Sequence, residues 1–302
     1  MQNDGVRWKL AFLGPVGTYS HQIAYDTFGD NVEYHARKTI SEVFHSVNAD
    51  FAFGILPQEN SIFGSVVETY DLFRDEELGK SKWIRGALTL PVQHSLIVHV
   101  GKTMQEIKEV LSHEQALGQC SLFLQTHVPS AKLVAVSSTA GAAEMVSQDP
   151  AAFNSAAICS KFCTKLFPHL EVLHEGIQNE NRNFTRFYVL ANERSSPLPW
   201  VCLDESQRYA LLRVQPCLNA KGQRSTINEL MAALQLPTSR VDRRPSGHGP
   251  FDHVYILEVF SKSRDEMNGE SHCEADRWED MVQEGIRRVI DTGDEAALLG
   301  IW

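Results

Sequence analysis

The chain has 302 residues, of which 43% are hydrophobic and 22% charged, and its formal net charge is −10 at pH 7. This length favours two or three domains over a single core, and the composition is typical of a soluble globular protein. The acidic balance argues against non-specific binding to nucleic acid or anionic lipid, because both require a basic surface. We therefore expect a small molecule or another protein as the partner, with no nucleic acid and no membrane.

The N-terminus and the cysteines favour a cytoplasmic protein. Residues 1–14 contain only a short apolar run, shorter than that of a secretory signal peptide. No segment approaches the roughly 18 apolar residues that span a bilayer. The six cysteines have neither CxxC pairs nor the spacing of a metal site. We expect reduced, mostly buried thiols and no metal ion.

Apolar runs and amphipathic stretches alternate over the first two hundred residues, as they do in an α/β domain. Strands are predicted at 8–14, 51–57, on both sides of Pro91 within 87–100, and at 109–113, 132–137, 156–160 and 184–190. Helices are predicted at 17–28, 65–73, 115–127 and 139–148. This order indicates a doubly wound sheet, or two of them.

The last third of the chain has a different pattern. Residues 192–207 are polar and contain two prolines, which predicts a linker between a domain at 6–191 and one at 208–302. Strands are then predicted at 209–216, 240–244, 253–260 and 297–302, and helices at 225–236 and 278–290. This strand-helix-strand-strand-helix-strand order is typical of a ferredoxin-like domain. Residues 261–277 are charged and lack an apolar period, so a mobile loop is expected there.

Four strand-to-helix junctions carry small polar side chains. In LGPVGTYSHQIA (13–24), the free N–H groups of the helix start and the hydroxyls of Thr18 and Ser20 could bind a carboxylate or phosphate. A simple N-cap would explain these hydroxyls equally well. Glu59, Asn60 and Ser61 follow a strand, at the sheet edge where α/β proteins bind ligands, although a polar turn is the alternative.

The other two junctions are SHEQALGQC (112–120), with Ser112 and Gln119, and SSTAGAA (137–143), with Ser138 and Thr139. A lone histidine such as His113 is weak support for catalysis, and the hydroxyls could again be helix caps. The chain contains no GxSxG, HExxH, GxGxxG or Lys-rich phosphate motif. Acyl transfer, zinc hydrolysis and nucleotide chemistry are therefore disfavoured.

The stretch NRNFTRFYVL (181–190) places Thr185 and Arg186 at the start of a predicted strand. The guanidinium of Arg186 could hold a carboxylate at two points, or it could pair with an internal Asp or Glu. Because side chains alternate along a strand, one straight strand cannot direct both residues to one ligand. We therefore expect the pair at the entrance of the strand, before the backbone joins the sheet.

Taken in order, GPVGTYSHQIA, LPQENSIFGSVVETYDL, SHEQALGQC, SSTAGAAE and NFTRF resemble the sequence blocks of prephenate dehydratase, over about residues 8–190. The remainder resembles the ACT regulatory domain. The resemblance implies a two-lobed catalytic domain like a type II periplasmic binding protein, followed by a βαββαβ ACT domain. It also implies conversion of prephenate to phenylpyruvate in L-phenylalanine biosynthesis without a cofactor, feedback by L-phenylalanine, and a homodimer or homotetramer.

Roles for individual residues follow from the same resemblance. Thr185 would donate a hydrogen bond or proton to the departing hydroxyl, and Arg186 would bind a carboxylate. Glu59 would be a general acid or a structural acceptor. Further catalytic residues would be Asn60, Ser112 and Gln119, and further substrate-binding residues Thr18, Ser20, Ser61, Ser138, Thr139 and Phe187.

The regulatory region departs from the family. VDRRPS (241–246) stands where the family carries a Glu-Ser-Arg-Pro block, so an effector site is expected at Asp242, Arg243, Arg244 and Pro245 with an altered ligand set.

Two alternative functions remain open. Arogenate dehydratase shares the fold and the motifs and differs in the substrate side chain. A non-catalytic amino-acid sensor could share the fold, although the Thr185–Arg186 pair favours an enzyme, because a sensor has no leaving hydroxyl to protonate.

Overall fold

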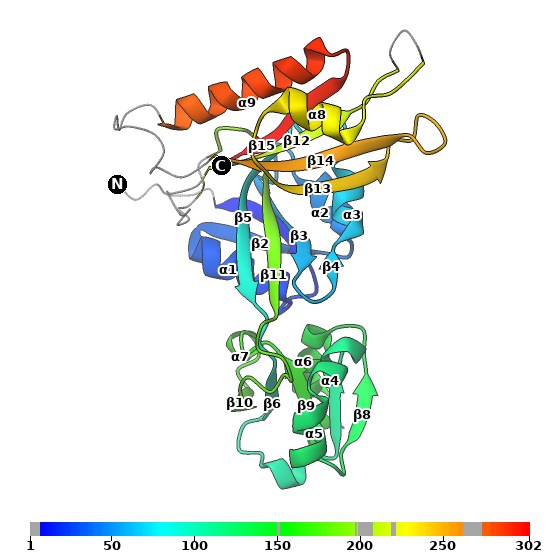
Figure 1. Ribbon diagram of the computed structural model, residues 1–302. Coiled ribbons are helices and arrows are strands. Elements are labelled where there is room, and N and C mark those ends of the chain that lie inside the picture. The colour runs from blue at the N-terminus through cyan, green and yellow to red at the C-terminus, as the bar shows by residue number, and fades with distance from the viewer. Residues whose placement is uncertain (1–6, 150–151, 197, 199–207, 219–221, 262–273) are drawn as a thin grey trace. The chain divides into compact units, whose positions relative to one another are not determined.

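The computed structural model describes residues 7–149, 152–196, 198, 208–218, 222–261 and 274–302 (Figure 1). It divides into two compact units. The first comprises Met1–Val43, Ile55–Ser65 and Leu88–Phe187, and the second comprises Phe44–Gly54, Val66–Ala87 and Tyr188–Trp302. Each unit is therefore assembled from segments that are far apart in the sequence.

Four strands of one sheet that lie wholly or partly in the first unit follow the order β11-β3-β1-β2. These strands are β1 (Trp8–Leu13), β2 (Val32–Arg37), β3 (Phe53–Asn60) and β11 (Phe184–Ala191), and short β4 (Gly64–Ser65) pairs with β3. Helix α1 (Tyr19–Phe28) and the 3₁₀ helix η1 (Gly29–Asn31) connect β1 to β2, which run parallel. Gly64, the first residue of β4, has φ of 80°, a conformation that favours glycine.

The second sheet of this unit has the order β10-β6-β9-β7-β8. Its strands are β6 (Ser95–His99), β7 (Glu109–Ser112), β8 (Lys132–Ala135), β9 (Ser155–Cys159) and β10 (Leu170–His174), and η2 (Met104–Glu106) precedes β7. Helices α4 (Glu114–Gln119) and α5 (Ser121–His127) cover one face, and α6 (Thr139–Gln148) and α7 (Cys163–Leu166) cover the other.

The strands of this sheet divide their side chains between two cores. Val110 and Ile158 pack with α4 and α5, whereas Leu111 and Ala157 pack with α6. A strand that is buried on both faces reads as a continuous apolar run, which is why AAICS was recognisable in the sequence. The expected doubly wound arrangement is confirmed for this sheet.

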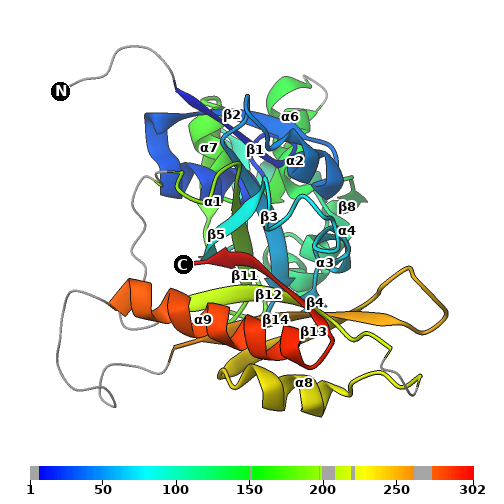
Figure 2. The same ribbon diagram turned by 90° about the horizontal axis from the view of Figure 1, so that it is seen from above.

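The second unit contains the ferredoxin-like order that the sequence predicts. Its elements are β12 (Tyr209–Gln215), α8 (Ile227–Leu234), β13 (Thr238–Pro245), β14 (His253–Phe260), α9 (Glu274–Asp291) and β15 (Glu295–Ile301). The strand order is β13-β14-β12-β15, and β5 (Trp83–Pro91) extends it where Ile84 pairs with Gly300. Helices α8 and α9 lie on the same side of the strands (Figure 2). They share a core with Leu212, Val214 and Leu257. Helix α3 (Val67–Leu72) also belongs to this unit, whereas α2 (Ile40–Ser46) has residues in both units.

Two expectations about helices were wrong. The helix predicted over 115–127 is two helices, because the chain turns at Cys120, where the side chain of Asn179 bonds the start of α5. The loop predicted at 261–277 ends earlier, since α9 already begins at Glu274. Residues 262–273 of that loop, and most of the predicted linker, lie outside the described residues.

The described part of the chain contains no helix that is long and apolar enough to span a bilayer. Cys120, Cys159 and Cys163 are buried free thiols, and Cys217 is half-buried. Burial raises the pKa of the Cys120 thiol to about 12, which makes it unreactive at neutral pH.

Candidate active site

Asn60 and Thr185 meet across β3 and β11, 125 positions apart in the chain. The Nδ2 of Asn60 donates to Thr185 Oγ1 at 3.0 Å and to Asn183 Oδ1 at 2.7 Å. The Oδ1 of Asn60 accepts from the backbone N–H groups of Ile62 and Phe63, at 3.0 and 3.1 Å. Two backbone donors on one end of the amide fix its orientation, so the NH₂ end must face Thr185. The Thr185 oxygen therefore accepts from Asn60 and keeps its own proton for another acceptor.

Arg186 and Glu59 meet on the opposite face of the same two strands. A guanidinium nitrogen of Arg186 lies 3.5 Å from a Glu59 carboxylate oxygen, and their side chains are 40% and 28% exposed. The internal pairing that the sequence left open is thus present. Alternation along β11 separates Arg186 from Thr185, as period two requires.

The expected position of the Thr185–Arg186 pair needs one correction. The two residues lie at the start of the strand, but the backbone has already joined the sheet, since β11 begins at Phe184. The backbone N–H of Ser61 donates to Phe184 O at 2.8 Å. The hydroxyl of Ser61 accepts from Phe184 N at 2.9 Å and donates to Arg182 O at 3.1 Å. Ser61 therefore holds the strand entrance in register.

The turn before α1 is a cap. Thr18 is the N-cap residue, and its hydroxyl donates to Leu13 O at 2.7 Å and accepts from His21 N at 3.4 Å. Ser20 is buried in the first turn of the helix. Gly17 has φ of 94°, and a Cβ there would lie 3.1 Å from Cys163 Sγ. Glycine therefore lets this turn approach α7 closely.

The remaining predicted residues of this unit lie at other strand and helix ends. The hydroxyl of Ser112 is fully buried and donates to Ile158 O at 2.6 Å, so it supports the sheet. Ser138 caps α6 by accepting from Gly141 N at 2.9 Å, and Thr139 is the first residue of that helix. Phe187 is 1% exposed and belongs to the core.

Gln119 brings in two residues that the sequence did not single out. Its Oε1 lies 2.6 Å from His94 Nε2, and His94 Nδ1 lies 2.9 Å from the hydroxyl of Tyr19. Asn183 is a third such residue, buried at 4% exposure beside Asn60. The only sequence signal for His94 was a polar residue between two apolar strands, which is too common to be specific.

The predicted effector block lies on β13. Arg244 Nε donates to Asp71 Oδ1 at 2.8 Å, and Arg74 donates to Pro245 O at 2.8 Å. Asp242 is ion-paired with Arg240 on its own strand, and Arg243 is exposed. Two of the four predicted effector residues therefore already hold internal charge partners.

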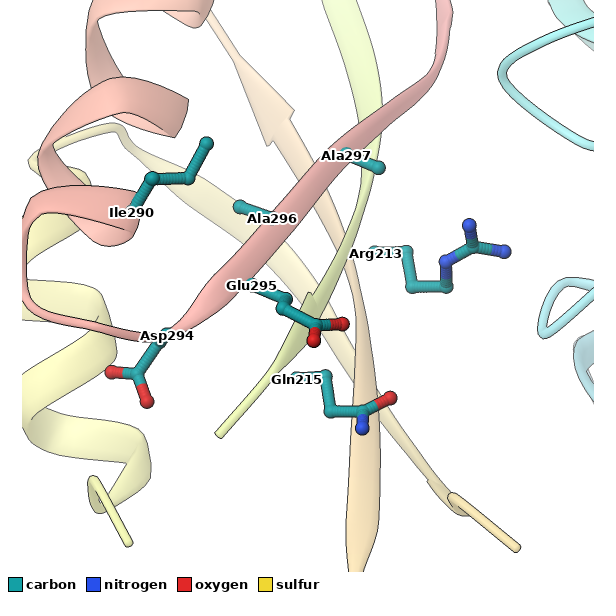
Figure 3. Close-up of a pocket in the computed structure, with 7 residues that line it drawn as sticks. All are labelled: Arg213, Gln215, Ile290, Asp294, Glu295, Ala296 and Ala297. Atoms are coloured by element: carbon teal, nitrogen blue, oxygen red, sulfur yellow. The ribbon is translucent and has the colours of Figure 1, made fainter. Parts of the chain in front are cut away.

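A pocket of about 330 Å³ lies elsewhere in the second unit (Figure 3). It is lined by Arg213, Gln215, Ile290, Asp294, Glu295, Ala296 and Ala297. Arg213 donates to the backbone oxygens of Phe73 and Asp75, and Asp294 accepts from Cys217 N at 2.8 Å. The charged groups of Arg213 and Asp294 are thus already hydrogen-bonded within the protein. Among the residues that the structure describes, no cluster of three His, Cys, Asp or Glu side chains could hold a metal ion.

Comparisons with known proteins show which family the chain resembles. Residues 10–195 match the family model of prephenate dehydratase. A bifunctional chorismate mutase/prephenate dehydratase from Pseudomonas aeruginosa is 31% identical over 263 residues, covering 86% of this chain and 67% of that protein. A prephenate dehydratase from Bacillus subtilis is 29% identical over 260 residues, covering 83% and 88%.

Solved structures share the fold. A prephenate dehydratase from Arthrobacter aurescens, in complex with L-Phe, has a TM-score of 0.71 at 24% identity and covers 97% of this chain and 89% of that one. GqqA, described as a novel type of quorum quenching acylase, also has a TM-score of 0.71, at 20% identity, with 97% of each chain covered. At these identities the likeness establishes the architecture, and the chemistry must be argued from the site.

Proposed function

The chain belongs to the prephenate dehydratase family, and we propose that it converts prephenate to phenylpyruvate, water and carbon dioxide. The ring carboxylate leaves as carbon dioxide, and its bonding electrons form the new double bond of the aromatic ring. The ring hydroxyl leaves with a proton as water. Because aromatisation drives the reaction, the protein has mainly to hold a dianion and to assist the departing hydroxyl.

One observation carries the proposal: Asn60 donates to Thr185, so the Thr185 proton is free of that contact. We assign to Thr185 the hydrogen bond to the departing oxygen. Asn60 orients the Thr185 hydroxyl and is itself oriented by the backbone of the β3–β4 turn. Such preorganised donors stabilise charge that develops on a leaving oxygen.

The other predicted residues receive supporting roles in the same proposal. Arg186 is 40% exposed and only 3.5 Å from Glu59, which supports a guanidinium that takes a substrate carboxylate while Glu59 stays nearby as a structural acceptor. We place Gln119 as a second neutral donor. Ser112 would be a further catalytic residue, Thr18, Ser20, Ser61, Ser138 and Thr139 would line the anion sites, and Phe187 would contribute to substrate binding.

We further propose a catalytic domain at 6–191, a linker at 192–207 and an ACT regulatory domain at 208–302. L-phenylalanine would be the effector, bound near Asp242, Arg243, Arg244 and Pro245, in a cytoplasmic homodimer or homotetramer. The βαββαβ order of the last domain supports this division.

Turnover of the purified chain tests the proposal. Prephenate and arogenate are supplied separately, while phenylpyruvate and phenylalanine formation are followed. Thr185→Ala should lower kcat roughly 10²- to 10³-fold with an unchanged unfolding temperature, whereas Thr185→Ser, which keeps the hydroxyl, should retain most activity. Thr126→Ala, on the exposed face of α5, is the matched control. Turnover of arogenate alone would move the assignment to arogenate dehydratase, and turnover of neither substrate would favour a sensor.

A further inference from the structure

His94 lies between two segments in which the sequence predicts substrate contacts. Its ring reaches Tyr19, at the start of α1, and Gln119, at the end of α4. The residue is 3% exposed. Its backbone is held on both sides, because His94 N donates to Gln178 Oε1 at 3.0 Å and Ile177 N donates to His94 O at 3.0 Å. The place of the ring is thus fixed, and the position of its proton is the remaining variable.

The burial of His94 favours the neutral form of its ring at pH 7. Burial lowers the pKa of His94 below its usual value, although the bond to Gln119 opposes this shift. Burial also raises the pKa of Tyr19 well above its usual value, so the phenol stays protonated. In a neutral imidazole one nitrogen donates and the other accepts. Only two arrangements of the three side chains satisfy this condition.

In the first arrangement the proton is on Nε2. Nε2 then donates to Gln119 Oε1, Tyr19 donates to Nδ1, and the NH₂ group of Gln119 is turned away from the ring. In the second, the proton is on Nδ1, and Tyr19 donates instead to Gln93 O, which lies 3.0 Å away. Gln119 must then turn its NH₂ group to the ring and its carbonyl oxygen away from it.

The two arrangements present opposite groups to an anion. An outward NH₂ group donates to a carboxylate, whereas an outward carbonyl oxygen repels it. The backbone of Gln119 is anchored separately, because Asn179 N donates to Gln119 O at 2.6 Å. The ring of His94 therefore orients the side-chain amide of Gln119, while Asn179 positions the backbone of Gln119.

We propose that His94 is a positioning residue whose Nε2–H, kept in place by the Tyr19 hydroxyl, orients the Gln119 amide to donate to an oxygen of the substrate. This inference rests on the proposed dehydratase function. It adds one condition to that function: the effect of His94 on catalysis must depend on the side chain of Gln119.

Steady-state kinetics with prephenate test the inference by a double-mutant cycle. His94→Leu should lower kcat/KM roughly tenfold, the effect of one lost orienting hydrogen bond. In a Gln119→Ala background the same change should cost less than twofold. His94→Gln, which places an amide donor near the former Nε2, should recover kcat/KM to within about threefold. His127→Gln, at an exposed histidine of α5, is the matched control and should leave kcat/KM unchanged.

The contrary outcomes are distinct. If wild-type protein turns over prephenate and His94→Leu costs the same factor with and without Gln119, the histidine has a general structural role and the inference is wrong. Failure of His94→Gln to recover activity contradicts it as well. If His94→Leu does not fold, Tyr19→Phe gives the same cycle, with a smaller expected loss that also disappears in Gln119→Ala. Absence of wild-type turnover would instead remove the proposed function itself.

Discussion

His21 shows how one buried side chain ties the turn before α1 to the core. Gly17 N donates to His21 Nδ1 at 3.1 Å, and the ring stacks on Phe12 with centroids 4.4 Å apart. The rings of Tyr34 and Phe162 pack against it in T-shaped arrangements. Because Nδ1 must stay unprotonated to accept from Gly17, protonation breaks this contact. Burial lowers the pKa of His21 from 6.5 to about 4.

This shift predicts a loss of stability in acid. The unfolded chain binds a proton below pH 6.5 while the folded chain does not until about pH 4. The free energy of unfolding is therefore intact above pH 6.5 and falls through that window, by roughly 3 kcal/mol in total. Urea unfolding of wild type and His21→Asn, which keeps an acceptor near Nδ1, measures the effect. The variant should lose less stability between pH 6.5 and 4. An equal loss in both proteins would contradict the assignment, and exposed His127→Asn is the control.

At the scale of elements, strand β11 carries groups for two different tasks. Thr185, near its start, meets Asn60 at 3.0 Å in the first unit. Tyr188, three residues on, donates to a buried Glu258 carboxylate at 3.2 Å in the second unit. Ser239 also donates to that carboxylate, at 2.9 Å. A buried carboxylate that loses a donor is left with an uncompensated desolvation cost.

Tyr188→Phe should therefore lower the free energy of unfolding by roughly 1 to 3 kcal/mol. It should leave kcat for prephenate within about twofold of wild type, because the Thr185–Asn60 contact does not depend on the phenol. Chemical denaturation and steady-state kinetics on one preparation measure both effects. Tyr255→Phe, on the same strand as Glu258, is the matched control. A large fall in kcat with unchanged stability would contradict this division of tasks.

At the scale of the molecule, the ferredoxin-like segment does not stand apart from the earlier chain. The second unit joins residues 44–54 and 66–87 to 188–302. Within it, Gly300 of β15 pairs with Ile84 of β5, and a Cβ at Gly300 would overlap with Ile84 O. Arg213 also donates to Phe73 O and Asp75 O. Removing the C-terminal segment would expose to solvent the surface of residues 44–54 and 66–87 that this segment covers.

Truncation after residue 205 should therefore lower the unfolding temperature as well as abolish inhibition of prephenate turnover by L-phenylalanine. In the full chain, Gly300→Ala should also lower the unfolding temperature, because the added methyl group must separate two paired strands. Gly86→Ala, where a Cβ would meet nothing within 4 Å, is the control. Equal unfolding temperatures of the two alanine variants would contradict this packing. A full-length protein that is insensitive to L-phenylalanine would contradict the regulatory assignment.

Much of the fold was predictable because its signals are local. Helix α6 spans the residues that its apolar period predicted, and the βαββαβ order of the last segment followed from alternating patterns. The break at Cys120 was not predictable, because it depends on a distant residue. The side chain of Asn179, 59 positions later in the chain, bonds the start of α5. The hydroxyls of Thr18 and Ser138 fitted either an anion site or a helix N-cap, and the structure shows that both residues are N-caps.

The sequence by itself determined the residue types of the site, the order of the elements and the family, because these depend on chemistry and on periods within short segments. Tertiary structure decided the pairings: Asn60 with Thr185, Glu59 with Arg186, and Gln119 with His94 and Tyr19. The physical reason is that strand order brings together residues that no local pattern relates. The alternation of side chains along the strand already placed Thr185 and Arg186 on opposite faces. The pairing of β3 with β11 then brought Asn60 to Thr185 and Glu59 to Arg186.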